Sequence, residues 1–164
     1  MADDLKPNPD EAFMRAALDA ARDGVARGAG GPFGACIVRD GRILAVAGNR
    51  VLAGHDPSAH AEVTAIRAAC ATLQTHLLDG AQIYSTTEPC PMCFAAIHWA
   101  RIAHIFFGTT IDDVARLGFN EMALSNEQMR AIGGSPVEIT SDFLHDECHG
   151  LLDFWTQLES RKTY

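Results

Sequence analysis

The sequence predicts a single α/β domain in which a mixed sheet carries helices on both faces. Helical and strand-like hydrophobic patterns alternate along most of the chain. An early pair of expected strands is separated by the turn dipeptide Asp40-Gly41. The length of 164 residues suffices for one sizeable core but not for two domains of usual size. We therefore expect residues 1–164 to form one domain that ends in a C-terminal helix and tail, residues 141–164.

Each expected element has a local justification in the sequence. Residues 9–26 combine helical spacing of apolar residues with an acidic first turn, and the glycine-rich residues 28–32 end that helix. Residues 35–38 and 43–47 flank the turn and are expected to form a β-hairpin. Further helices are expected at 59–73, 91–99, 112–117 and 146–159, and further strands at 83–86, 103–107 and 137–140. The resulting order, α-β-β-α-β-α-β-α-β-α, favours the mixed sheet.

Composition narrows the class of protein. Hydrophobic residues make up 48% and charged residues 21%, which is ordinary for a soluble globular protein. No apolar run approaches the roughly 18–20 residues of a membrane span, and the acidic N-terminus lacks the apolar stretch of a secretory signal. The five cysteines, two of them in a CxxC motif, suit a metal site in a reducing compartment better than a disulfide framework. We therefore expect a cytoplasmic protein with no membrane segment.

The charge balance bears on the partner. The net charge is −8, and no basic run is longer than the pair Arg161-Lys162. Binding to nucleic acid requires Lys and Arg to neutralise phosphates, although a local basic patch can suffice. A nucleic acid is therefore not the expected partner, and a small molecule is.

Two short motifs carry the chemistry: His60-Ala61-Glu62 and the run EPCPMC at residues 88–93. One imidazole and two thiols can hold a zinc ion on three ligands, which leaves the fourth position open as in catalytic zinc sites. Residues two apart on a helix flank point in nearly opposite directions, so His60 and Glu62 can share a site only at the helix start. Pro91 favours the first helical position and places Cys90 just before the helix. The spacing therefore predicts two helix N-termini directed at one metal, with Glu62 beside it to move protons.

Other readings of these motifs remain open. The three residues could belong to a structural zinc site with a fourth ligand, or be a solvent-facing histidine and two packed cysteines. A different class of protein is a zinc-stabilised binding module without catalysis, in which Glu62 would be replaceable.

The pattern H-x-E followed by P-C-x-x-C is the signature of zinc-dependent nucleobase deaminases. With it, residues 30–120 resemble the cytidine-deaminase-like superfamily, and within it the bacterial guanine deaminases. The resemblance is carried by GGPFGA at 30–35, Asn49, DPSAHAEVTAIR at 56–67, EPCPMC at 88–93, AIHWAR at 96–101 and GFN at 118–120. The family usually shows Gly-Phe-Asp-Asp where this chain has Gly-Phe-Asn120-Glu121, and residues 121–150 match poorly.

The resemblance implies a three-layer α/β/α sandwich with a five-stranded mixed sheet. It implies a homodimer, with residues 141–164 as the segment that some members exchange between subunits. It implies one Zn²⁺ per subunit on His60, Cys90 and Cys93, with Glu62 as the proton shuttle.

Further site residues follow from the same resemblance. Asp113 matches a second catalytic carboxylate. The expected contacts to a nucleobase are made by Phe33, Asn49, Ala61, Trp99 and Tyr164. Structural explanations compete at several of these positions: a turn for Asn49, core packing for Phe33 and Trp99, a helix start for Asp113 and a frayed end for Tyr164.

The function that these residues indicate is zinc-dependent hydrolytic deamination of a free nucleobase, with guanine to xanthine and ammonia as the first choice. Guanosine, cytosine or another small aminated heterocycle is the alternative. Deamination of a tRNA adenosine is a further one, disfavoured by the acidic balance.

Overall fold

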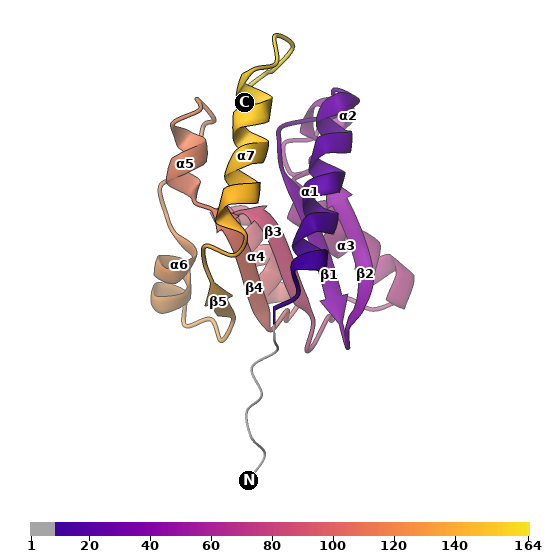
Figure 1. The fold of residues 1–164 in the computed structure, drawn as a ribbon. Helices are drawn as coiled ribbons and strands as arrows, with labels where there is room; N and C mark the ends of the chain where they lie inside the picture. Colours follow the sequence, from indigo (N-terminus) through magenta and orange to yellow (C-terminus); the bar gives the residue numbers. More distant parts are fainter. Residues whose placement is uncertain (1–8) are drawn as a thin grey trace.

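The computed structural model describes residues 9–164 and contains a five-stranded sheet in the order β2-β1-β3-β4-β5 (Figure 1). The strands are β1 (Gly34–Arg39), β2 (Arg42–Gly48), β3 (Gln82–Thr87), β4 (His104–Thr109) and β5 (Glu138–Thr140). β1 pairs antiparallel with both β2 and β3, whereas β3–β4 and β4–β5 are parallel pairs. The predicted mixed sheet is thus confirmed.

The turn between β1 and β2 forms as the sequence predicts. Asp40 and Gly41 have φ angles of 52° and 70°. Two successive residues with positive φ are the requirement of a type I′ turn, whose twist matches that of the two strands. The hairpin therefore follows from the Asp-Gly pair itself.

Helices cover both faces of the sheet, which completes the three-layer α/β/α sandwich. In Figure 1, α1 (Glu11–Ala26) and α7 (His145–Thr156) lie in front of the strands, and α3 (Ala61–Leu73) and α4 (Pro91–Trp99) lie behind them. Alternating strand residues feed two cores. Cys36, Tyr84 and Phe106 pack under α1 and α7, and their neighbours Ile37, Ile83 and Ile105 pack under α3 and α4.

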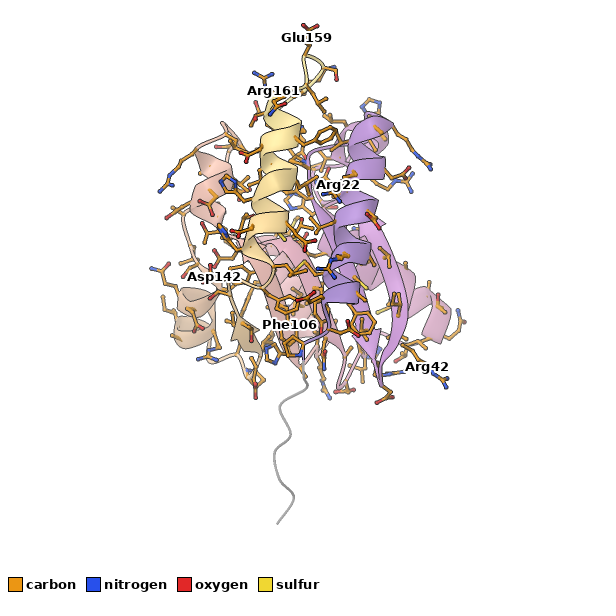
Figure 2. The ribbon with its side chains drawn as sticks, in the orientation of Figure 1. Arg22, Arg42, Phe106, Asp142, Glu159 and Arg161 are labelled. Atoms are coloured by element: carbon orange, nitrogen blue, oxygen red, sulfur yellow. The ribbon has the colours of Figure 1, made fainter. Side chains whose placement is uncertain are left out.

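The core and the surface separate as the hydrophobic pattern requires. Phe106 is 1% exposed and stacks on Tyr84, with ring centroids 4.7 Å apart. Figure 2 shows Phe106 against the strands, whereas Arg42, Glu159 and Arg161 project from the periphery. None of the helices in residues 9–164 combines the length and apolar character that crossing a bilayer requires.

Three short helices complete the structure: α2 (Val51–Gly54), α5 (Ile111–Ala115) and α6 (Asn126–Gly133). The sequence pattern predicted α5 but did not predict α2 or α6. α2 has four residues, too few to show a helical period. α6 has a capping box between Ser125 and Gln128, a signal that its sequence does contain. The helix has only eight residues and is polar on average, so its apolar period is short.

Candidate active site

The two chemical motifs meet because each stands at the start of a helix. His60 is the N-cap of α3 and Cys90 the N-cap of α4, both with extended backbone. Pro91 occupies the first position of α4, where its missing N–H costs nothing and its fixed φ suits the helix. Cys93 then lies in the first turn of α4, and Glu62 in the first turn of α3. The predicted convergence of two helix N-termini is confirmed.

The three candidate ligands fit a zinc ion. The Nδ1 atom of His60 lies 3.6 Å from the Cys90 sulfur and 3.5 Å from the Cys93 sulfur. In a tetrahedral site, Zn–S bonds of about 2.3 Å and Zn–N bonds of about 2.0–2.1 Å separate the nitrogen and sulfur atoms by about 3.5 Å. Among residues 9–164, these three are the one His/Cys/Asp/Glu group with metal-ligand spacing. Three protein ligands leave a fourth position for water or substrate.

The two thiols differ in acidity in the metal-free protein. A hydrogen bond from Cys93, together with the adjacent His60, lowers the pKa of Cys90 to about 4 despite burial. The same hydrogen bond and deep burial raise the pKa of Cys93 well above its usual value. These surroundings favour the thiolate, the form that binds metal, at Cys90, and Cys93 has to lose its proton when a metal binds.

Glu62 is a buried carboxylate directly beside these ligands. It is 6% exposed, and its Oε2 atom lies 3.5 Å from the Cys93 sulfur. Burial, followed by the negative charge of Cys90, raises the pKa of Glu62. Its Oε1 atom lies 3.1 Å from the Ser85 hydroxyl, which also lies 2.6 Å from the Thr87 carbonyl oxygen. Because the hydroxyl has one hydrogen, it can donate to only one of these two acceptors at a time.

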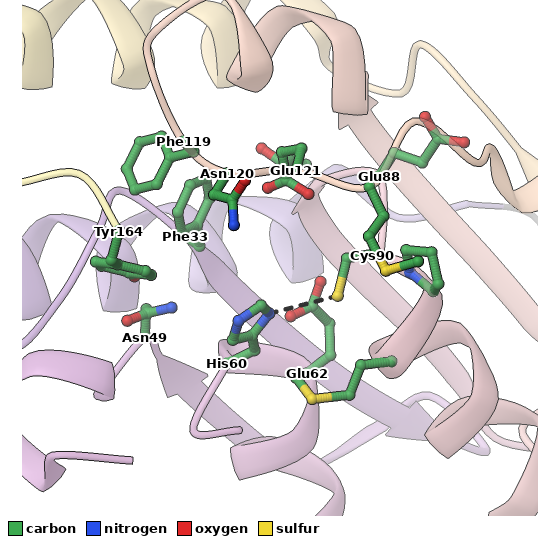
Figure 3. A pocket seen from close by; sticks show the side chains of 14 residues that line it. Phe33, Asn49, His60, Glu62, Glu88, Cys90, Phe119, Asn120, Glu121 and Tyr164 are labelled. Carbon is green, nitrogen blue, oxygen red and sulfur yellow. Dashed lines mark hydrogen bonds between the residues drawn. The ribbon is translucent and has the colours of Figure 1, made fainter. Parts of the chain in front are cut away.

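A cavity of about 210 Å³ opens above the candidate ligands. Figure 3 shows His60, Glu62 and Cys90 at its floor, Asn49 and Tyr164 at one end, and Phe119, Asn120 and Glu121 across from them. The remaining residues of its lining are Phe33, Thr87, Glu88, Pro91, Met92 and Met122. The cavity thus presents aromatic faces together with a few polar groups, as sites for small ligands do.

The end of the described chain returns to this cavity. The Tyr164 hydroxyl accepts a hydrogen bond from the Gly31 backbone N–H at 3.1 Å, and the Tyr164 carbonyl accepts one from the Asn120 N–H at 3.0 Å. Burial raises the pKa of Tyr164 to about 12. The ring packs edge-on against Phe119, with centroids 5.3 Å apart. Tyr164 therefore closes the cavity of its own chain.

The other predicted substrate contacts divide into two groups. Phe33 and Asn49 line the cavity, and the Asn49 side chain also accepts a hydrogen bond from the Val51 N–H at 3.1 Å. Ala61 is fully buried in the core under α3 and does not line the cavity. Trp99 stands at the end of α4 with 79% of its surface exposed, beside a different cavity. Trp99 is the last of the nine residues of α4, so it lies at the opposite end of that helix from the site.

Asp113 also lies away from the cavity lining. Its carboxylate accepts hydrogen bonds from the Thr110 backbone N–H and hydroxyl at 2.9 and 2.8 Å, which completes the capping box of α5. The backbone hydrogen bond is the main reason why the pKa of Asp113 is lowered. Within one chain, Asp113 therefore makes the contacts of a residue that stabilises a helix start, which was the structural alternative for this position.

A second carboxylate does reach the cavity, and it is Glu121. Burial, with a smaller contribution from the Cys90 thiolate, raises its pKa to about 7. The sequence analysis noted Glu121 only as a departure from the family pattern. The sequence does contain a signal for Glu121. It occupies the position of the last Asp in the family pattern Gly-Phe-Asp-Asp, so a carboxylate is present in both. Glu88, a motif residue without an assigned role, also lines the cavity and is 8% exposed.

The fold and the site together define a zinc-dependent deaminase. Residues 7–109 match the family model for the cytidine and deoxycytidylate deaminase zinc-binding region, and the chain belongs to this family. It is accordingly a hydrolase that acts on C–N bonds, and its His/Cys/Cys cluster lies within the matched region and is consistent with zinc.

Individual relatives have two different activities. The chain is 47% identical over 117 residues to a guanine deaminase of Bacillus subtilis, covering 71% of this chain and 75% of the relative. It is 34% identical over 154 residues to a tRNA-specific adenosine deaminase of the same species, which covers 93% of this chain and 92% of the relative. A solved guanine deaminase from Nitrosomonas europaea superposes with a TM-score of 0.79 at 31% identity. The superposition covers 89% of this chain and 84% of that chain. The family is therefore settled, whereas the relatives differ in substrate.

Proposed function

We propose that this enzyme hydrolyses free guanine to xanthine and ammonia. The observation that carries the proposal is the small cavity over the proposed zinc ligands, one end of which Tyr164 covers. Its volume of about 210 Å³ falls below the roughly 300–1,000 Å³ typical of pockets for drug-sized ligands. With Tyr164 hydrogen-bonded to Gly31 and Asn120, this space suits a bare heterocycle better than a nucleoside or a flipped nucleotide with its backbone. The similarity to guanine deaminases supports the same choice.

His60, Cys90 and Cys93 would hold the zinc ion. When bound, zinc supplies Lewis acidity, which lowers the pKa of a water molecule enough to provide a nucleophile at neutral pH. The two helix N-termini place partial positive charge at the thiolates, which favours their deprotonated form. The three side chains would leave zinc one position for water or substrate, and the cavity lies above them.

Glu62 carries the protons. It accepts the proton of the attacking water as the new C–O bond forms at the amino-bearing carbon of the base, and it protonates the adjacent ring nitrogen. Glu62 then takes the remaining proton of the newly added hydroxyl group and delivers it to the amino group. The C=O bond of xanthine forms as the C–N bond breaks, and ammonia leaves. Its raised pKa suits both roles, because a carboxyl with a pKa nearer neutrality can accept and return a proton. The overall balance is guanine plus water to xanthine plus ammonia.

The remaining cavity residues would bind and orient the base. Phe33 and Phe119, with ring centroids 5.1 Å apart, form an aromatic side against which a planar base can lie. Asn49, 2% exposed, offers its amide as a hydrogen-bond partner to a ring edge. Glu121 offers a second carboxyl for the ring or the departing amino group. Tyr164 would exclude bulk water once the base is bound.

The substrate is tested by ammonia release from the purified, zinc-loaded protein across guanine, guanosine, adenine, cytosine, cytidine and a tRNA anticodon stem-loop. We expect guanine to have the highest kcat/KM and guanosine to be turned over poorly, because the sugar would have to displace Tyr164. Faster release from guanosine than from guanine would contradict the small-cavity argument. No release from any of the six would remove the guanine assignment.

Deamination of a tRNA adenosine is the second candidate, because several relatives are tRNA-specific adenosine deaminases. Such an enzyme must neutralise phosphates, so its affinity for the stem-loop should fall steeply with salt. The net charge of −8 argues against that property. Stem-loop turnover with a steep salt dependence would establish this candidate in place of guanine.

We also propose that the enzyme is a homodimer. The exposed apolar side chains support this: Trp99 is 79% exposed, Ile132 82% and Met122 65%. Large apolar side chains that stay exposed to this degree would be covered in an association face. Light scattering after size exclusion should give twice the chain mass of 17.7 kDa, and Trp99→Ser should shift the protein toward monomer. Exchange of residues 141–164 between subunits would appear as a crosslink between residues 164 and 31 of different chains.

A further inference from the structure

The buried carboxylate of Glu88 connects two parts of the active site that are distant in the sequence. Its Oε1 atom accepts a hydrogen bond from the Asn126 backbone N–H at 2.8 Å, and its Oε2 atom accepts one from the Ile111 backbone N–H at 3.2 Å. Its own backbone N–H donates to the Thr109 carbonyl at 2.7 Å. Each oxygen of a single side chain thus binds a different helix.

Both of these N–H groups belong to first positions of helices, Ile111 in α5 and Asn126 in α6. The N-cap side chains, Thr110 and Ser125, accept from the third positions, Asp113 and Gln128. The first-position groups therefore need another acceptor, because a buried backbone N–H without a partner is costly. Glu88 supplies that acceptor at both helices, and its negative charge strengthens both hydrogen bonds.

A further hydrogen bond attaches α6 to the same loop. The Asn126 side chain, fully buried, donates through its Nδ2 atom to the Pro89 carbonyl oxygen. Pro89 lies between Glu88 and the zinc ligand Cys90. The start of α6 is thereby fixed to the backbone that carries a metal ligand.

Residues 116–125, which we call the wall segment, lie between the two helices that Glu88 holds. This segment supplies Phe119, Asn120, Glu121 and Met122 to the cavity. Most of it is irregular, and Phe119 anchors its middle by packing against Trp155 and Tyr164. Its position relative to the zinc ligands therefore depends on this packing and on where α5 and α6 are held.

We propose that Glu88 is a positioning residue that sets the distance between the zinc ligands and the substrate-contacting wall segment. The proposal rests on the proposed function in that it assigns the wall segment to substrate binding. Glu88 itself exchanges no proton with the substrate in this scheme. It acts by holding Ile111 and Asn126 against the loop that leads to Cys90.

The test compares Glu88→Gln with wild type and with Glu127→Gln, a matched control in the first turn of α6 that is exposed and pairs with Arg130. Glutamine preserves the shape of Glu88 but turns one acceptor oxygen into an NH₂ donor that faces a backbone N–H. We expect Glu88→Gln to retain zinc. Amide hydrogen exchange in residues 111–126 should become at least about tenfold faster, because a hydrogen bond to a charged acceptor is lost. KM for guanine should rise by a larger factor than kcat falls. Glu127→Gln should change none of these.

A measurement on the wild-type protein keeps the test decisive if Glu88→Gln does not fold. The Ile111 and Asn126 amides should exchange at least about tenfold more slowly than the amide of Glu11, which holds the first position of α1. Equal exchange rates would overturn the proposal, as would unchanged exchange or unchanged KM and kcat in Glu88→Gln. If wild type releases no ammonia from guanine, the proposed substrate fails, whereas the exchange rates still decide the role of Glu88.

Discussion

The zinc ligands and the wall segment face each other across one cavity but are built in different ways. His60, Cys90 and Cys93 stand at the starts of α3 and α4, helices that pack directly on the sheet. The wall segment has little regular structure; Glu88 holds the starts of the two helices beside it, and Phe119 packs its middle against Trp155 and Tyr164. The reactive groups thus belong to rigid elements, whereas the groups that would contact the base belong to a loop.

This difference separates the chemistry from the choice of substrate. Catalytic groups must be held to within fractions of an ångström, which packed helices can provide. Loops tolerate changes of sequence with less effect on the fold, so substrate preference can diverge there. A family whose members deaminate guanine in one case and a tRNA adenosine in another fits this arrangement.

Removal of zinc should have the largest effect, because it disables the rigid side of the cavity entirely. A chelator should abolish ammonia release, and added zinc should restore it. The melting temperature should fall on chelation and recover with zinc, since a ligand that binds only the folded state stabilises it. Full activity in metal-free protein would show that the chemistry does not depend on the ligand cluster.

Replacement of Glu62 should come next. Glu62→Gln preserves the size of the side chain but cannot carry the proton, so kcat should fall by about 10²–10⁴-fold while bound zinc is unchanged. Metal analysis and steady-state kinetics provide the two measurements. Near-wild-type kcat would refute the proton-transfer role and support a binding module without catalysis.

Glu121 and Asp113, the two candidates for the second catalytic carboxylate, allow a matched comparison. Glu121→Gln should lower kcat/KM for guanine by about 10–100-fold, because Glu121 lines the cavity. Asp113→Asn should leave kinetics close to wild type but destabilise the protein by about 0.5–2 kcal/mol, because Asp113 completes a helix cap. Denaturant unfolding and kinetics on both variants measure this. The reverse result would return the second catalytic role to Asp113.

The smallest expected effect is a pH dependence of stability in the zinc-free protein. Glu121 has its pKa raised from 4.5 to about 7 by burial and by the Cys90 thiolate, so the folded state holds its proton more tightly than the unfolded state. Its contribution to stability is therefore full below about pH 4.5 and is lost as the pH rises through about 7. After allowance for partial solvent exposure, the loss should be about 1–2 kcal/mol. Glu121→Gln should remove that slope in unfolding measurements between pH 5 and 8; a slope that persists must come from another group.

The rigid side of the site could be predicted from the sequence because its rules are local. Pro91 fixes the start of α4, and the two-residue spacing of His60 and Glu62 requires a helix start. The hairpin followed from Asp40-Gly41 for the same reason.

The wall segment could not be predicted in this way. Asp113 is kept from the cavity by the capping box of α5. Glu121 reaches the cavity because of the course of an irregular loop. The bonds from Glu88 to Ile111 and Asn126 span 23 and 38 residues, and no local pattern announces such contacts. Trp99 likewise stood in a motif, yet its helix carries it to the surface.

Because Glu88 holds the helix on each side of the wall segment, this segment is suited to exchange between related proteins. Since the starts of both flanking helices are anchored to one side chain, the exposed part of the segment can change in length or composition while Phe119 stays packed against Trp155. The entropic cost of such length changes is small, about 0.6 kcal/mol for each doubling of a flexible loop. Exchanging residues 116–125 among relatives, with Glu88, Phe119 and the two helix starts retained, is therefore a direct route to redesigning which amine the enzyme removes.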